Sequence, residues 1–193
     1  MPPTSWVQHL NVKVHSRVAT LDLAPAINVF HRWIQNAYGD HLLLDVADYR
    51  HVPAGPGVIL VAHEAIYGLD ESGHQLGLLY NRRTVAEGEP AAVITAALQY
   101  ALAACVQLES EPEFTGSLAF DGGAIEVSVN DRSVAANEDA AAAKLLAELT
   151  PVLGRALGDD HRTERLGEQR DRLGFLARGA GRLDAATVLA RLS

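Results

Sequence analysis

The amino-acid sequence predicts an α+β fold, in which a mixed, mainly antiparallel sheet of about seven to eight strands is backed by about four helices. Strand-like segments follow one another in neighbouring runs, whereas a doubly wound α/β protein would alternate single strands with helices. Short turn signals join several of these runs, as hairpins require. The expected elements also form two loosely similar series. The sheet is therefore a candidate for pseudo-duplication, although no repeat of residues supports one.

Each expected element rests on the spacing of its apolar side chains, which is two residues in strands and about 3.6 residues in helices. The expected strands lie at residues 7–15, 42–49, 58–69, 76–82, 118–120, 125–129 and 173–177. The expected helices lie at residues 22–37, 90–108, 137–157 and 184–192. Gly39 would end the first helix, and Asn137 and Asp184 would cap the third and fourth.

Two local patterns specify the sheet further. Leu42, Leu43 and Leu44 make both faces of their strand apolar at one end, which predicts a central position in the sheet. The segment Asp121-Gly122-Gly123 lies between two short strand-like runs, and hairpin turns need residues that adopt positive φ. We therefore expect a second hairpin between residues 118–120 and 125–129.

Length and composition are those of a globular protein. A chain of 193 residues can bury roughly 70% of its unfolded surface in one core. Its 48% hydrophobic and 21% charged residues are typical of folded domains. We expect one α+β domain over residues 1–193, or alternatively two fused halves, residues 1–110 and 111–193.

Charge and targeting signals limit the expected partners and compartment. The net charge of −8 argues against a nucleic-acid partner, because phosphates are bound by a basic face. The opening MPPTSWVQHL lacks the features of a signal peptide, and polar residues interrupt the longest apolar helical segment, so we expect no membrane partner. The single Cys105 permits no internal disulfide and suits a reducing compartment. We expect a cytoplasmic protein.

The segment of residues 42–83 is the expected functional region. It combines apolar, strand-like runs with many ionisable and hydrogen-bonding side chains. These are Asp45, Asp48, Tyr49, His51, His63, Glu64, Tyr67, Tyr80 and Arg82. Burying such groups costs free energy unless they are paired or used, so a site is expected here before elsewhere.

The dipeptide His63-Glu64 invites comparison with the H-E-x-x-H signature of zinc proteases. That signature needs a second histidine one helical turn later, but Tyr67 stands three residues after Glu64 in a strand-like run. In a regular strand the two side chains point to opposite faces. If the loop of residues 71–75 joins the two strands, Glu64 lies opposite Arg82, and the two could form a structural ion pair. A catalytic or ligand-binding role for Glu64 remains the alternative.

One hypothesis is an enzyme in which His63 acts as general acid or base. A carboxylate, Asp45 or Glu64, would orient the imidazole, whose pKa near neutrality suits proton transfer. No histidine and carboxylate spacing in the chain matches a recognised metal site, so no metal is expected. The sequence identifies no cofactor.

A binding module is the preferred hypothesis. The central strands and the helix at residues 90–108 would frame a mostly apolar pocket with a few polar groups that orient a small-molecule ligand. These groups are Tyr49, His63, Tyr67, Tyr80 and Arg82. A third hypothesis is a homo-oligomer, in which the helices at residues 90–108 and 137–157 present the face of a dimer.

Four segments resemble a family of uncharacterised bacterial proteins. They are DVADY at residues 45–49, GPGV at 55–58, HEAIYGLD at 63–70 and LLYNR at 78–82. The resemblance covers most of the chain and is most specific in this central block. It implies a recurring bacterial domain, and it carries no substrate, cofactor or catalytic role to this sequence.

Overall fold

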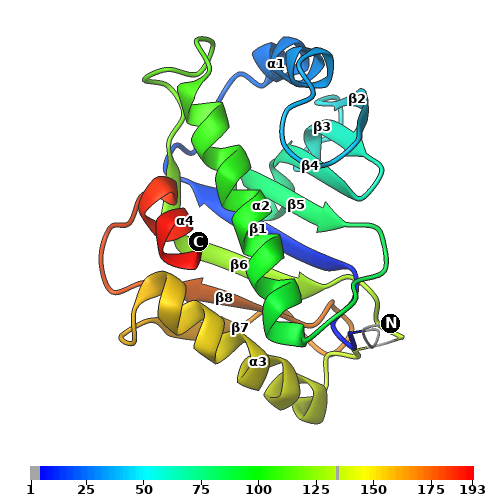
Figure 1. The fold of residues 1–193 in the computed structure, drawn as a ribbon, viewed down its shortest axis with the longest axis vertical. Coiled ribbons are helices and arrows are strands. Elements are labelled where there is room, and N and C mark those ends of the chain that lie inside the picture. Colours follow the sequence, from blue (N-terminus) through cyan, green and yellow to red (C-terminus); the bar gives the residue numbers. More distant parts are fainter. Residues whose placement is uncertain (1–4, 134) are drawn as a thin grey trace.

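The computed structural model describes residues 5–133 and 135–193 and has the expected α+β architecture (Figure 1). Eight strands form one sheet in which every neighbouring pair is antiparallel, and four α-helices accompany it. The fold class and the approximate numbers of strands and helices are thus confirmed.

The sheet has the strand order β2-β3-β4-β5-β1-β6-β8-β7. The strands are β1 (Leu10–Ser16), β2 (Leu43–Tyr49), β3 (Gly57–Ala62), β4 (Ala65–Asp70), β5 (Gly77–Arg82), β6 (Phe120–Val129), β7 (Arg162–Arg165) and β8 (Gly174–Arg178). The helices are α1 (Ala24–Gln35), α2 (Pro90–Ser110), α3 (Asp139–Leu157) and α4 (Ala185–Leu192), and a short 3-10 helix, η1 (Ser72–His74), lies between β4 and β5.

The helices lie together on one face of the sheet (Figure 1). The long helix α2 crosses β1 and β5, α1 covers β2 and β3, α4 packs on β6, and α3 packs on β8. Alternate strand residues such as Val12, Val14, Leu78 and Ile125 point toward the helices and are fully buried. The apolar core therefore fills the space between this face and the helices, as the strand period of two requires.

The chain follows a similar path twice. β1 is followed by α1 and by the strands β2 to β5, of which β5 returns beside β1 before α2 begins. β6 is followed by α3 and the hairpin β7–β8, of which β8 returns beside β6 before α4 begins. β1 pairs antiparallel with β6, and α2 packs against α4. The two series therefore face each other across the β1–β6 pair as two-fold related copies would.

Helix α2 is long and apolar enough to meet the simple criteria of a membrane span. Half of that apolar stretch is buried inside the fold, where α2 contacts β1, β5, α3 and α4. A helix surrounded by other elements is apolar on most sides for this reason alone. Its composition is accounted for by its place in the core.

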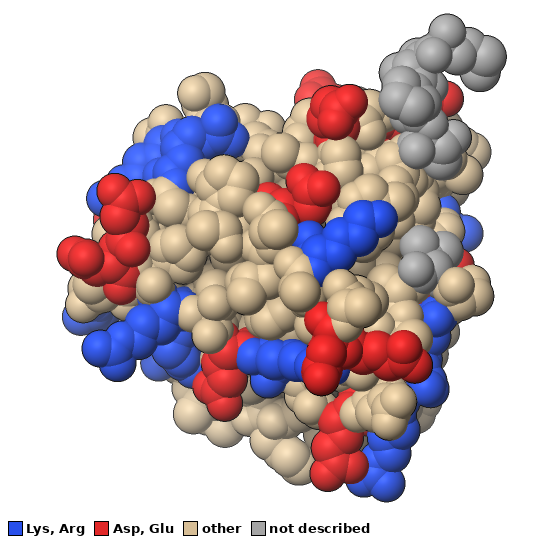
Figure 2. Space-filling model, turned by 90° about the horizontal axis from the view of Figure 1, so that it is seen from below, with Lys and Arg blue, Asp and Glu red and all other residues tan. Residues whose placement is uncertain are grey.

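Charged side chains of both signs share the outer surface. On the face drawn in Figure 2, the described basic side chains are interspersed with acidic ones. In the charged segment that follows α3, Arg165 forms an ion pair with Asp139 at 2.7 Å and Arg170 with Glu168 at 3.5 Å. Residues 162–165 of this segment form the edge strand β7, a strand that the spacing of apolar residues does not indicate.

The prediction of one continuous strand at residues 58–69 is wrong. The chain reverses at His63 and Glu64, and β3 pairs antiparallel with β4 through Val61 and Ile66. The next hairpin sets Ala65 opposite Arg82, one residue away from the expected register. A shift of one residue moves every side chain to the other face. The expected pairing of Glu64 with Arg82 therefore does not form.

The expected central position of the triple-leucine strand is also wrong, because β2 is the edge strand next to β3. Leu42 and Leu44 are exposed by 62% and 51%, and Leu43 packs against the core. The register of β2 against β3 shifts between Leu43 and Asp45, as at a β-bulge. Bulges and charged side chains are common protections of an edge strand, and Asp45 and Asp48 supply the charges.

The expected hairpin at Asp121-Gly122-Gly123 does not exist, because residues 120–129 form the single strand β6. Neither glycine adopts a positive φ. A Cβ on Gly122 would lie 2.6 Å from the carbonyl oxygen of Asp184, which precedes α4. The glycines therefore permit a close backbone approach and do not make a turn.

The helix boundaries agree with the sequence pattern, with one difference in capping. Asp184 caps α4 as expected, since its carboxylate accepts a hydrogen bond from the backbone N–H of Thr187. The third helix begins at Asp139, and Asn137 does not cap it. Instead, the buried Asn137 amide donates to the carbonyl oxygens of Leu166 and Glu168 and holds the loop after β7.

Candidate functional site

An apolar cavity of about 330 Å³ lies on the helical side of the sheet. It is lined by the end of α1 and the loop after it, by α2, by β2, β3 and β4, and by the end of α4. We call this cavity the aromatic pocket. Its lining residues are Trp33, Tyr38, Gly39, Asp40, His41, Leu43, Leu60, Tyr67, Ala96, Gln99, Tyr100, Ala103, Leu189 and Ser193. Its volume lies at the small end of the range for ligand sites.

Aromatic rings form most of the wall. His41 lies against Tyr100 with ring centroids 4.2 Å apart, and Trp33 lies against Tyr38 with centroids 4.4 Å apart. Behind this wall, Tyr80 packs at 5.3 Å from Tyr67. Rings at these distances form a rigid surface on which a flat molecule could stack.

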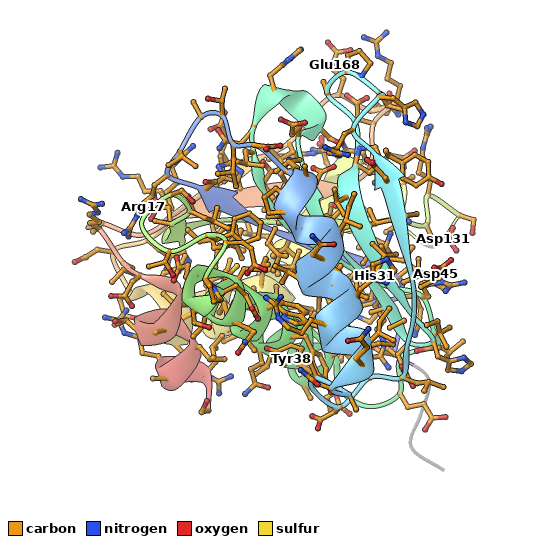
Figure 3. The ribbon with its side chains drawn as sticks, turned by 90° about the horizontal axis from the view of Figure 1, so that it is seen from above. Arg17, His31, Tyr38, Asp45, Asp131 and Glu168 are labelled. Carbon is orange, nitrogen blue, oxygen red and sulfur yellow. The ribbon has the colours of Figure 1, made fainter. Side chains whose placement is uncertain are left out.

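The loop between α1 and β2 supplies one side of the pocket. Ala37 and Gly39 both have positive φ, which turns the chain sharply at the end of the helix. The turn brings Tyr38 onto α2, where its hydroxyl donates to the carbonyl oxygen of Ala103 at 3.2 Å. Figure 3 shows Tyr38 beside the end of α1 and α2, and Asp45 apart from it on β2.

One hydrogen bond crosses the pocket wall from the loop to the sheet. The hydroxyl oxygen of Tyr67 on β4 lies 2.8 Å from Nδ1 of His41. Burial lowers the pKa of His41 below its ordinary value of 6.5, so the imidazole is neutral at pH 7. Burial also raises the pKa of Tyr67, which keeps its hydroxyl protonated. The pair therefore presents a neutral donor and acceptor to the cavity.

Tyr38 and Tyr80 are neutral as well. Burial raises the pKa of Tyr38 to about 12 and that of Tyr80 to about 12. The Tyr80 hydroxyl is buried, and the Arg82 side chain is its polar neighbour, without a hydrogen bond of ordinary geometry. Neutral hydroxyls within an apolar wall favour uncharged ligand groups beside them, because a charge there would lose its hydration without a compensating partner. Asp40, the acidic residue of the lining, is exposed to solvent.

The structure brings together some of the residues predicted to bind a ligand and separates others. Tyr67 lines the aromatic pocket, and Tyr80 packs directly behind it. Arg82 lies at the end of β5 and donates to the carbonyl oxygen of Thr84. Tyr49 is 40% exposed at the far end of the edge strand and packs against His51. His63 is exposed in the turn between β3 and β4.

The three residues considered for catalysis do not form one group. No hydrogen bond joins His63 to a carboxylate in the described part of the chain. The carboxylate of Glu64 accepts from the backbone N–H of Leu42 at 3.1 Å. That of Asp45 accepts from the backbone N–H of Val46 at 2.8 Å. Within residues 5–133 and 135–193, no three histidine, cysteine or acidic side chains gather as metal ligands would.

Sequence reasoning missed His41, Tyr100, Tyr38 and Trp33 as pocket residues. His41 has the pattern of a surface histidine, and Trp33 and Tyr38 have that of a helix end. Tyr100 carried a weak signal, because its aromatic hydroxyl follows Gln99 in a helix segment that is mainly apolar. The others are joined only by the tertiary fold, since the loop after α1 and the middle of α2 are distant in sequence.

Comparison with known proteins adds no assignment to this geometry: no protein-family model matches the chain, and no curated protein is significantly similar to it.

Proposed function

We propose that the protein binds a small, uncharged and mainly aromatic molecule in the aromatic pocket. The observation that carries this proposal is a cavity of about 330 Å³ walled by His41, Tyr67 and Tyr100. Its neutral hydrogen-bonding groups are those of the Tyr67–His41 pair. A few polar groups in an apolar cavity are the usual composition of a small-molecule site. The ring pair of His41 and Tyr100 would stack against the ligand, and Tyr67 or His41 would orient it.

The proposal is tested by thermal unfolding with p-cresol, benzamide and nicotinamide as ligands. A ligand at about ten times its Kd adds about 1.4 kcal/mol to the free energy of unfolding. For a chain of this size, that raises the Tm by about 3–6 °C. We expect at least one of the three aromatic compounds to produce such a shift.

Variants of α2 locate the binding site. Ala103→Phe would fill the cavity from α2, and we expect it to abolish the shift. Ala92→Phe makes the same change at an exposed position of the same helix and should leave the shift unchanged. If no compound shifts the Tm, or if both variants retain the shift, the aromatic pocket is not the site.

Two other functions remain proposals. A homo-oligomer would use α2 and α3, but α2 already contacts β1, β5, α3 and α4, which leaves it less surface for a second copy. Light scattering of the purified chain tests this directly, and a monomer at high concentration would contradict it.

An enzyme based on His63 would need an orienting carboxylate, and His63→Ala should then abolish turnover without lowering the Tm.

A further inference from the structure

The face of the sheet that the helices leave uncovered holds a second concave site. This polar groove has a volume of about 480 Å³ and is lined in part by Asn11, Lys13, Leu79, Asn81, Ser128 and Arg172. Its floor is β1 with its neighbours β5 and β6. The loop after β4 and the loop before β8 contribute to its walls. It lies on the side of the sheet opposite the aromatic pocket, so the two sites are separate.

Three polar side chains form a row across the floor. Asn11 on β1 is paired in register with Asn81 on β5 and with Ser128 on β6. Because the three residues share one level of the sheet, their side chains point to the same face. Strands lie about 4.8 Å apart, so the row spans about 10 Å.

The side chains of this row have no partner among residues 5–133 and 135–193. None of Asn11, Asn81 and Ser128 makes a side-chain hydrogen bond to another described residue. Asn11 is only 5% exposed, and its Oδ1 is fully buried without a partner. A buried amide in this state costs free energy, and nearly all such groups in proteins are hydrogen-bonded. The Nδ2 atom of the same amide is not fully buried and has no partner among the described residues, so it is the atom that a ligand on the floor would reach.

The charged groups of the floor are already paired, whereas the exposed Arg172 in the wall has no ion-pair partner among the described residues. The buried Lys13 ammonium donates to Asp70 at 2.5 Å and to the carbonyl oxygen of Ser72 at 2.9 Å. His15 lies 2.5 Å from Glu126 on the neighbouring strand. The unused hydrogen-bonding capacity of the floor is thus neutral and consists of two amides and a hydroxyl.

We propose that the polar groove binds a polyhydroxylated small molecule of the size of one or two sugar rings. The Asn81 amide and the Ser128 hydroxyl can each donate and accept, and the Asn11 amide nitrogen between them can donate, which matches neighbouring hydroxyl groups that do both. The half-buried Leu79, one level away from Asn81 on β5, offers an apolar surface for the C–H face of such a ligand. A ligand hydroxyl on this floor would accept the hydrogen bond that the Asn11 amide nitrogen can donate.

Saturation-transfer NMR with glucose, maltose, trehalose and myo-inositol tests the proposal on the full chain. We expect at least one of these polyols to receive saturation from the protein. Asn11→Leu should weaken its binding at least tenfold. The same variant should raise the Tm of the ligand-free protein, since it removes an unpaired buried amide. Asn28→Leu, the same change at an exposed position of α1, should leave binding unchanged.

A second variant protects the test against a failure of Asn11→Leu to fold. Ser128→Ala removes one hydroxyl from the row and should weaken binding several-fold. The proposal is overturned if no polyol in the panel binds, or if binding survives in the folded variants. It is also overturned if light scattering shows a dimer that Leu79→Arg dissociates, because this face would then be an interface between two copies.

Discussion

Glu111 shows how one side chain can join two helices. It follows the last residue of α2, and its carboxylate accepts hydrogen bonds from Arg32 at 2.5 Å and from the Trp33 indole at 2.7 Å, both on α1. Gln107 donates to the same carboxylate at 2.9 Å. Because Trp33 is also a wall of the aromatic pocket, Glu111 positions the pocket without touching it.

These bonds make stability depend on pH. Partial burial raises the pKa of Glu111, but the hydrogen bonds from Arg32, Trp33 and Gln107 outweigh it and hold the pKa below its ordinary value of 4.5. A carboxyl whose pKa is lower in the folded protein stabilises the fold above the unfolded pKa. That contribution is fully present at pH 7 and is lost as the pH falls through the folded pKa, below 4.5.

We predict that Glu111→Gln lowers the free energy of unfolding by about 1–2 kcal/mol at pH 7, because charge-assisted hydrogen bonds are lost. Urea titrations at pH 7, 5, 4 and 3 measure the difference, which should shrink below pH 4.5. Glu87→Gln, at an exposed residue without a described partner, is the control. A difference that stays constant with pH would show that the charge of Glu111 contributes nothing.

The pocket residues could be predicted from sequence only in part. Tyr67 and Tyr80 could be predicted because they lie in a region where polar groups interrupt apolar runs. In the structure the two residues pair in register on the neighbouring strands β4 and β5. His41 was not found, because its significance lies in its contact with Tyr67 and Tyr100. A contact between a loop and a helix distant in sequence leaves no periodic pattern.

At the scale of single elements, the periodicity of apolar residues predicted the existence of most strands and helices but not their junctions. The run of residues 58–69 is apolar on both sides of His63, so nothing in its period marks the reversal. The triple leucine at residues 42–44 indicates burial, yet β2 lies at the edge, where a bulge turns Leu44 outward. Register and edge position depend on what packs beside a strand.

The two glycines of β6 give an element-scale prediction. Gly122→Ala would place a Cβ 2.6 Å from the carbonyl oxygen of Asp184 and 3.0 Å from the backbone nitrogen of Ala185. The start of α4 would have to move, and we expect a loss of about 1–3 kcal/mol in the free energy of unfolding. Differential scanning calorimetry should show a Tm several degrees lower.

Gly181→Ala is the matched control, because a Cβ there meets no heavy atom within 4 Å. It should change the free energy of unfolding by no more than about 0.5 kcal/mol. Equal Tm values for the two variants would show that Gly122 is not needed for the approach of α4 to β6.

At the scale of the whole molecule, one sheet and one core connect the two similar series of elements. The β1–β6 pair lies in the middle of the sheet, and α2 contacts both α3 and α4. If the series were separated at residue 110, β1 and β6 would each lose a neighbour and expose a sheet edge. The contacts between the series are therefore part of the stability of each.

We predict that the chain unfolds in one cooperative transition. Trp33 lies in the first series, and Trp6 contacts Lys144 and Glu148 of α3 in the second. Tryptophan fluorescence of Trp6→Phe and of Trp33→Phe should therefore give the same urea midpoint as far-UV circular dichroism, apart from any change in stability caused by the substitution. Two separate midpoints within one variant would mean that the halves unfold independently.

The amino-acid sequence alone determined the α+β class, a mainly antiparallel sheet, the positions of the helices and the apolar faces that they bury. These features depend on the local spacing of apolar and polar side chains, which can be read directly from the sequence. The tertiary structure decided the strand order, the edge position of β2, the reversal at His63 and the role of the glycines in β6. It also decided which aromatic side chains meet at the pocket and left the Asn11 amide unpaired on the open face. Such features arise from contacts between distant segments, and only the packed fold brings those segments together.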